Sequence, residues 1–222
     1  MKDVIHLKTG FKELDELING INERELITIA SRPALGKSTL AIDIINNVSK
    51  QINNKILYFN LESSEENLRQ RIISSNVEII NDTHSIEDIK EKCEELKDRF
   101  SLVMIDYFQL ITTSNDYDNI IEERSYVSRM IKSIALEYKI PIIVTSQLPH
   151  FIEERDDKRP TLHDFRFGSS LQQDTDKLIY IYSGDYYKNQ RLKEVELIVT
   201  KNRGGKLGTI ELKFNRDTCT FE

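Results

Sequence analysis

An apolar run, a short loop that ends in Gly-Lys-Ser and a helical pattern follow one another between Leu26 and Leu40. This order is typical of a phosphate-binding loop, or P-loop. The backbone N–H groups of such a loop converge with the positive end of the following helix, and together they attract the phosphates of a nucleotide. We therefore expect ATP to bind at Ser31, Arg32, Pro33, Ala34, Leu35, Gly36, Lys37, Ser38 and Thr39.

Two residues of this loop have specific expected roles. Lys37 reaches the β and γ phosphates, and the hydroxyl of Ser38 binds Mg²⁺. Ser31 occupies the first position of the loop, where glycine is usual. Because positive φ is costly for serine, we expect the loop to avoid that geometry at Ser31. An ordinary strand-to-helix turn that binds nothing is the competing interpretation, and the flanking strand and helix patterns disfavour it.

Composition excludes several classes of protein. The 222 residues are 39% hydrophobic, which is enough for the core of one large domain. A formal net charge of −6 excludes a uniformly basic nucleic-acid binder, so contact with nucleic acid requires a local basic patch. No apolar run approaches the length of a membrane span, and Cys93 and Cys219 have neither metal-site spacing nor a disulfide framework. We expect a cytoplasmic protein without membrane contact.

Strand-length apolar runs alternate with longer periodic segments, which predicts an α/β fold with a mostly parallel central sheet flanked by helices. Strands are expected at residues 26–30, 55–60, 102–106 and 141–146, with helices at about 64–75 and 85–100. A periodicity of two follows at 178–182, 195–200 and 209–214, and a turn at Gly204-Gly205 joins the last two into an antiparallel hairpin. Residues 1–222 are expected to form a single domain.

Polar side chains follow the ends of several predicted strands. Ligands of open α/β sheets bind at the carboxyl ends of the strands, so these side chains are expected on one side. Asp106 ends an apolar run and is the expected acid that orders Mg²⁺ through water, although a strand-terminal Asp can also cap the next turn. Glu62 can polarise the attacking water. Gln147 either contacts the γ-phosphate or is an ordinary loop residue, and spacing alone does not decide between these interpretations.

Further short motifs occur in a fixed order along the chain: Lys8-Thr-Gly-Phe-Lys-Glu-Leu-Asp15, Ala30-Ser-Arg-Pro-Ala-Leu-Gly-Lys-Ser-Thr39, Asn60-Leu-Glu62, Val103-Met-Ile-Asp-Tyr-Phe-Gln-Leu110, Pro141-Ile-Ile-Val-Thr-Ser-Gln-Leu148, Asp157-Lys-Arg-Pro160, Asp164-Phe-Arg166, Gln173-Asp-Thr-Asp176 and Lys201-Asn-Arg-Gly204. In this order they resemble the RecA-like motor domain of replicative DnaB-type helicases over nearly the whole chain. The resemblance implies a RecA-like P-loop fold and a Mg²⁺-dependent ATP hydrolase. Such a motor forms a hexamer and moves 5′–3′ on single-stranded DNA.

The resemblance also assigns roles to individual residues. It makes Glu62 the catalytic glutamate and Gln147 the γ-phosphate sensor. Lys201 and Arg203, on the hairpin, would reach across to the ATP of the next subunit, whereas composition alone favours a solvated hairpin tip. The residues implied to contact single-stranded DNA are Lys158, Arg159, Arg166, Phe167 and Gly168.

The sequence departs from the family pattern in the DNA loop, where Phe167 replaces an acid and Ser169 replaces a glycine. The family's N-terminal helical domain is expected to be absent, because the first matching motif already begins at Lys8. These departures support a second interpretation, a RecA-fold nucleotide-binding assembly or regulatory module that does not unwind DNA. Expected partners are single-stranded DNA, further copies of the chain in a hexamer, and a primase or helicase loader. In isolation the chain is expected to assemble weakly or to remain a monomer.

Overall fold

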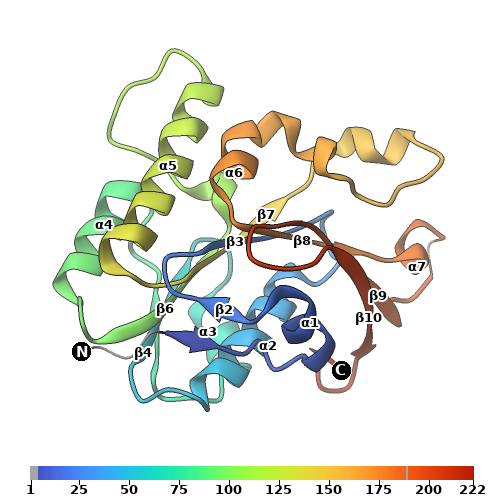
Figure 1. The fold of residues 1–222 in the computed structure, drawn as a ribbon, viewed down its shortest axis with the longest axis horizontal. Helices are drawn as coiled ribbons and strands as arrows, with labels where there is room; N and C mark the ends of the chain where they lie inside the picture. Colours follow the sequence, from blue (N-terminus) through green and yellow to red (C-terminus); the bar gives the residue numbers. More distant parts are fainter. Residues whose placement is uncertain (1–4, 189) are drawn as a thin grey trace.

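A nine-stranded sheet in the order β11-β10-β9-β8-β3-β7-β6-β4-β5 forms the centre of the protein (Figure 1). The computed structural model describes residues 5–188 and 190–222, with residues 166–169 described by their backbone only. The strands of this sheet are β3 (Leu26–Ser31), β4 (Lys55–Asn60), β5 (Val77–Ile80), β6 (Phe100–Asp106), β7 (Ile142–Gln147), β8 (Lys177–Tyr182), β9 (Glu194–Asn202), β10 (Gly208–Asn215) and β11 (Thr220–Phe221). A small antiparallel pair, β1 (His6–Leu7) with β2 (Ile21–Asn22), lies outside it.

The sheet has a parallel part and an antiparallel part. Strands β8, β3, β7, β6, β4 and β5 pair in parallel. Strands β9, β10 and β11 continue the sheet from β8 as antiparallel neighbours. The expected α/β class is therefore confirmed. Strands β3 and β6 are buried along their full length, which explains why they read as continuous apolar runs rather than as alternating ones. Strand β8 is also buried along its full length, so the periodicity of two expected there does not correspond to an exposed face.

Helices cover both faces of the sheet (Figure 1). One core packs α1 and α2 against the sheet, and the other packs α4 and α5 against the opposite face. Within the described residues no helix is long and apolar enough to cross a membrane. The helices are α1 (Lys12–Ile18), α2 (Lys37–Ser49), α3 (Glu65–Arg69), α4 (Ile86–Glu95), α5 (Ile120–Tyr138), α6 (Ser169–Asp174) and α7 (Gly184–Tyr187), with short 3-10 turns η1 (Phe108–Leu110), η2 (His150–Glu154) and η3 (Leu162–Gly168).

The helix expected over residues 64–75 is wrong in extent, because α3 ends at Arg69. Side-chain amides hold the following segment in an irregular path. Asn46 on α2 donates to the Arg71 carbonyl and accepts from the Ile73 N–H, and Asn76 donates to the carbonyls of Ser49, Ile52 and Asn54. The two Asn46 bonds satisfy backbone groups that a longer helix would otherwise pair, and the Asn76 bonds attach the end of the segment to the turn after α2. Likewise α4 stops at Glu95, short of the expected residue 100.

The C-terminal strand β11 is attached to helix α2 through a buried acid. The Phe221 N–H donates to Asp43 Oδ2 at 2.8 Å. Burial raises the pKa of Asp43 to about 6 from its ordinary value of 3.8, although the Phe221 bond and the Arg71 charge oppose the shift. At neutral pH the folded chain thus carries an ionised carboxylate in an unfavourable environment.

We predict that Asp43→Asn stabilises the fold at neutral pH. Between pH about 4 and about 6 the folded chain retains a proton that the unfolded chain has released, so wild-type stability falls as pH rises through this window. Asparagine avoids this penalty and can still accept from Phe221. Urea denaturation at pH 7.5 should show a gain of roughly 1–3 kcal/mol that shrinks toward pH 4.5. A gain of the same size at both pH values, or the same gain in the exposed control Glu91→Gln, would contradict the prediction.

Candidate functional site

The loop between β3 and α2 has the backbone expected of a phosphate cradle. Its left-handed residues are Ala34, with φ 61°, and Gly36, with φ 89°. Ser31 is not among the described residues with positive φ, which confirms the expectation for that position. A Cβ on Gly36 would lie 2.7 Å from a ring atom of Phe221. Glycine is therefore required at residue 36 both by its backbone angle and by the close packing of β11.

The first residues of the loop are held by contacts within the chain. The Ser31 hydroxyl donates to the Arg32 carbonyl at 2.7 Å. The Arg32 guanidinium is buried and donates to Glu153 Oε1 at 2.7 Å and to the Leu148 carbonyl at 2.6 Å. Because the Arg32 side chain is committed to η2 and to the end of β7, its expected contact with ATP would come from the backbone N–H.

Lys37 is the first residue of α2, and its ammonium lies in the field of two acids. Burial lowers the pKa of Lys37, while the charges of Asp106 and Glu62 raise it and partly offset the burial. A phosphate beside the ammonium would further favour the charged form. The structure thus brings the predicted phosphate-binding cation and the two predicted acids to one place.

Asp106 ends β6 and is fixed by donors from both neighbouring strands. It is only 1% exposed. Tyr58 Oη on β4 donates to Asp106 Oδ2 at 3.1 Å, and Thr145 Oγ1 on β7 donates to Oδ1. Burial and the charge of Asp106 raise the pKa of Tyr58, which keeps its hydroxyl protonated as a donor. In the described residues no N–H of the following turn bonds to this carboxylate, so the capping alternative does not describe it.

Glu62 follows β4 on a turn that Asn60 organises. The Asn60 amide donates to the Ser63 carbonyl at 2.6 Å and accepts from the Ser63 N–H at 3.0 Å. The carboxylate of Glu62 is exposed and forms no hydrogen bond or ion pair with another residue in the described part of the chain. It is therefore available to accept a proton from a water molecule.

Gln147 is the last residue of β7 and pairs with Ser31 across the sheet. Its side chain is exposed and makes no hydrogen bond within the described residues. Its backbone is bound by the side-chain amide of Gln109, which accepts from the Gln147 N–H at 3.1 Å and donates to the Gln147 carbonyl at 3.0 Å. Gln147 is thus a strand residue rather than a loop residue. Its backbone is fixed, and its side-chain amide has no partner among the described residues.

The donor set fits Mg²⁺ bound together with a nucleotide. Among the described residues there is no cluster of three or more His, Cys, Asp or Glu side chains that could hold a metal ion without further ligands. Ser38 opens α2, and Asp106 is the fixed acid at the same edge of the sheet. Mg²⁺ commonly uses one or two such protein oxygens and takes its remaining ligands from phosphates and water.

Lys201 and Arg203 lie away from this edge. Lys201 on β9 pairs with Leu178 at the start of β8, whereas the P-loop follows the carboxyl end of the parallel strand β3. Lys201 Nζ donates to the Gln172 and Gln173 carbonyls at 2.6 and 3.0 Å. Arg203 donates to the Gln173 carbonyl at 2.8 Å and lies 3.3 Å from Asp176 Oδ1. Within one subunit the structure does not bring these two cations to the P-loop.

The residues predicted to contact DNA fall into two groups. Lys158 donates to the Arg155 carbonyl at 2.7 Å, and Arg159 forms two bonds to Glu196, at 2.8 and 2.6 Å. Both side chains are therefore held within the chain. The side chains of Arg166 and Phe167, and the surroundings of Gly168, lie outside the described residues, so their predicted role stays a prediction.

Sequence reasoning missed three residues that shape the site: Tyr58, Thr145 and Gln109. Tyr58 and Thr145 are polar groups inside otherwise apolar strands, which is a usable signal that their hydroxyls have a buried partner. Gln109 lies three residues after Asp106 and carries no signal of its own.

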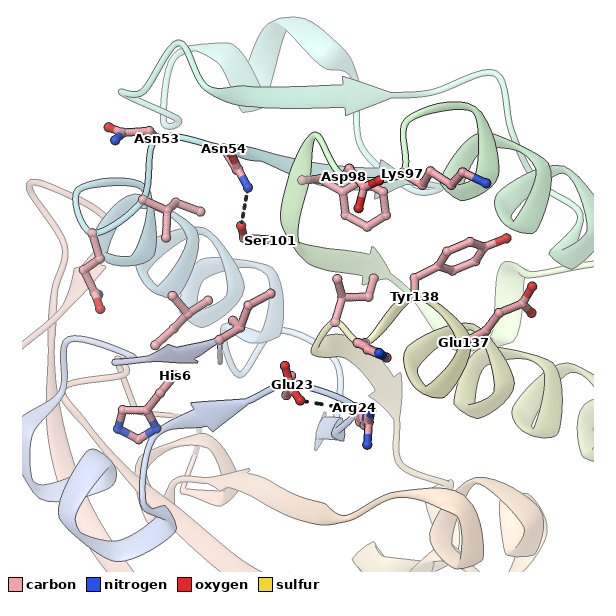
Figure 2. Close-up of a pocket in the computed structure, with 17 residues that line it drawn as sticks. His6, Glu23, Arg24, Asn53, Asn54, Lys97, Asp98, Ser101, Glu137 and Tyr138 are labelled. Carbon is pink, nitrogen blue, oxygen red and sulfur yellow. Dashed lines mark hydrogen bonds and ion pairs between the residues drawn. The ribbon is translucent and has the colours of Figure 1, made fainter. Parts of the chain in front are cut away.

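A cavity of about 910 Å³ lies elsewhere, at the amino ends of β4, β6 and β7 (Figure 2). Several of its polar side chains already contact one another: Asn54 donates to Ser101 at 3.1 Å, and Arg24 lies 3.9 Å from Glu23. The cavity is on the edge of the sheet opposite the P-loop, so it is not the site where the predicted groups converge.

Comparison with known proteins identifies the fold. The model of the family described as DnaB-like helicase C terminal domain matches residues 6–84 and 78–222. A solved structure described as an ATPase domain superposes with a TM-score of 0.89 at 28% identity, covering 99% of this chain and 91% of that one. A DnaB-like replicative helicase, solved in work on its interactions with primase, superposes with the same TM-score and identity. That alignment covers 99% of this chain and 62% of the helicase chain. These neighbours confirm the expected RecA-like architecture.

The curated relatives are longer than this chain. Replicative DNA helicase DnaB of Geobacillus stearothermophilus is 33% identical over 257 residues, covering 99% of this chain and 57% of the relative. Replicative DNA helicase DnaC of Bacillus subtilis (strain 168) has the same identity and coverage. The chain thus spans a little more than half the length of these relatives. From its sheet order, its strand-end site and a family match along nearly its whole length, the chain belongs to the DnaB-like helicase C-terminal domain family.

Proposed function

We propose that residues 1–222 form the ATP-hydrolysing motor domain of a DnaB-type replicative helicase, which acts in the cytoplasm and translocates 5′–3′ on single-stranded DNA. The observation that carries this proposal is the meeting of a phosphate cradle, a fixed acid and two unbonded side chains at one edge of the sheet. Lys37, Asp106 and Glu62 interact there electrostatically. A purely structural turn would not require a buried, fixed Asp106 carboxylate in the field of the Lys37 ammonium.

The geometry suggests a division of labour among these residues. The loop N–H groups and Lys37 would bind the β and γ phosphates, and Ser38 and Asp106 would hold Mg²⁺, which would neutralise phosphate charge. Glu62 accepts a proton from the attacking water, because its carboxylate has no competing donor among the described residues. Gln147 contacts the γ-phosphate through its amide. Hydrolysis then cleaves the bond between the β and γ phosphates.

A second subunit would complete the site. Lys201 and Arg203 lie at the edge opposite the P-loop, so they are poorly placed to serve the ATP of their own chain. To serve the ATP of a neighbour they would exchange their bonds to the Gln172 and Gln173 carbonyls and to Asp176. The Arg203 side chain is 55% exposed in its ion pair with Asp176. An exposed ion pair contributes little free energy, so Arg203 can leave it for another partner at small cost. An arginine supplied in trans accelerates related phosphoryl transfers by about 10³–10⁵. A hexameric ring is the assembly that we propose.

Single-stranded DNA, and a primase or a helicase loader, are the proposed partners. Arg166, Phe167 and Gly168 are proposed DNA contacts together with Lys158 and Arg159, which would exchange their bonds to the Arg155 carbonyl and to Glu196 for phosphate. The DnaB-like replicative helicase of similar fold was solved in work on its interactions with primase, which supports primase as a partner here.

An assembly or regulatory module that binds nucleotide without unwinding is the second candidate. The intramolecular bonds of Lys158 and Arg159 favour it, because DNA would have to displace these bonds before the two cations could contact phosphate. ATP turnover measured with and without single-stranded DNA at low salt separates the two functions. A motor is stimulated by DNA and loses the stimulation steeply as salt rises. A module shows turnover or nucleotide binding that DNA does not change.

We predict that Lys37→Ala and Glu62→Gln fail at different steps. Lys37→Ala removes the cation that faces the phosphates, so both nucleotide binding and turnover should fall. Glu62→Gln keeps the cradle but removes the proton acceptor, so binding should persist while turnover drops by roughly 10²-fold or more. Fluorescent-nucleotide titration and phosphate release measure the two steps. The controls Lys50→Ala and Glu66→Gln, exposed on α2's end and on α3, should match the wild type. Full turnover in Glu62→Gln would place the base elsewhere.

We also predict that two inactive variants complement each other. Lys37→Ala cannot use its own nucleotide site but still supplies Arg203 to a neighbour. Arg203→Ala keeps its nucleotide site but supplies no arginine to a neighbour. A mixture therefore contains interfaces with both intact parts and should recover part of the turnover that neither variant has alone. Arg203→Ala should fold, because Asp176 keeps its bonds to Lys132 and to the Leu26 N–H. Normal turnover in Arg203→Ala, or no recovery in mixed oligomers, would contradict a role in trans.

A further inference from the structure

The carboxyl end of β7 lacks a strand neighbour on one side. Strand β6 pairs with β7 only from Val103 opposite Ile142 to Ile105 opposite Val144. On the other side, β3 continues to pair as far as Ser31 opposite Gln147. In a parallel ladder the N–H and C=O of one residue point to the same neighbour. The N–H and C=O of Gln147 therefore face the side that β6 has already left.

The side chain of Gln109 occupies the place of the missing strand. Its Oε1 accepts from the Gln147 N–H at 3.1 Å, and its Nε2 donates to the Gln147 carbonyl at 3.0 Å. The same Nε2 donates to Ser146 Oγ at 3.0 Å. A primary amide can mimic a peptide group in this way, because it carries a donor and an acceptor side by side.

Gln109 is itself held by a residue of α5. The Arg124 guanidinium donates to the Gln109 carbonyl at 2.7 Å and to the Ile111 carbonyl at 2.8 Å. It also lies 5.8 Å from the centroid of the Phe108 ring, within the range of a cation–π contact. The turn η1 that presents Gln109 is thus anchored to a long helix rather than left as a mobile loop.

The opposite side of the β7 end is attached to the P-loop. The Leu148 N–H donates to the Ser31 carbonyl at 2.9 Å, and Arg32 donates to the Leu148 carbonyl at 2.6 Å. The backbone of Gln147 is therefore fixed between the phosphate loop and Gln109. The Gln147 side chain has no bond of its own in the described residues, so these two attachments fix only the backbone position from which its amide extends.

We propose that Gln109 is a positioning residue for ATP hydrolysis, which holds the backbone of Gln147 so that its amide meets the γ-phosphate. The inference rests on the proposed function, which gives Gln147 that contact. Gln109 touches neither nucleotide nor water in this role. It acts through the two hydrogen bonds to the Gln147 backbone.

Two variants of Gln109 test the proposal by their effect on kcat and KM. Gln109→Ala removes the amide, and Gln109→Glu keeps its size but loses both donated bonds and brings a negative charge to the Gln147 carbonyl. Both should lower kcat by roughly 10- to 100-fold, the usual cost of a misplaced catalytic group. KM for ATP and the affinity for a non-hydrolysable analogue should stay within about twofold, because the P-loop is untouched. Hydrogen exchange of the Gln147 amide should accelerate in Gln109→Ala, which removes the acceptor of that N–H, but not in Gln109→Glu, which keeps it.

A double variant separates positioning from a general structural role. If Gln109 acts only through Gln147, then Gln109→Ala combined with Gln147→Ala should be no slower than Gln147→Ala alone. Gln51 supplies a matched control, because its side-chain amide also bonds a backbone N–H and C=O, those of Lys8, at 2.9 and 2.8 Å. Gln51→Ala should lower thermal stability without changing kcat.

Each result bears on a different claim. Wild-type kcat in Gln109→Ala and Gln109→Glu, or losses that multiply in the double variant, would overturn the positioning role while leaving ATP hydrolysis intact. Equal kcat losses in Gln51→Ala and Gln109→Ala would also overturn it, since both would then act through stability. A wild-type chain that does not hydrolyse ATP as an oligomer would overturn the proposed function and this inference together.

Discussion

The parallel registration of the central strands is the constraint on which the rest of the structure depends. Strand β3 pairs with β7 as far as Ser31 opposite Gln147, and β4 pairs with β6 as far as Asn60 opposite Asp106. Because parallel strands end at one edge, the P-loop, the acid and the two neighbouring polar segments leave the sheet together. A shift of one residue in any of these pairings would turn the side chain at the strand end to the other face.

Within that edge, burial distinguishes groups that are held from groups that are free. Asp106 is buried and receives donors from Tyr58 and Thr145, so its position does not depend on a ligand. The side chains of Glu62 and Gln147 are exposed and have no hydrogen-bonding partner in the described part of the chain. Fixed groups suit a site where charge must be stabilised without reorganisation, and free groups suit contacts that form only with the bound nucleotide.

Local sequence signals predicted the strands and the phosphate loop, since apolar runs, Gly36 and the following helical period are all short-range patterns. Contacts between residues far apart in sequence could not be predicted. Arg32 bonds Glu153, and Gln109 bonds the Gln147 backbone in place of a neighbouring strand. The sequence around Arg32 and Gln109 contains no pattern that predicts these partners. The same limit explains why the helix predicted at 64–75 is too long, because the Asn46 amide on α2 bonds backbone groups of Arg71 and Ile73. The proposed roles of Lys201 and Arg203 follow from the family resemblance and would require a second subunit.

The central claim is that one subunit holds an incomplete ATP site that a neighbour completes. It is tested most directly by ATP turnover per chain over a wide range of protein concentration, with the native mass of the particle measured at each point. Turnover per chain should be nearly absent where the mass is that of a 25.9 kDa monomer and should rise as oligomers form. A turnover per chain that is the same in monomers and oligomers would show that each subunit is complete and would contradict the account.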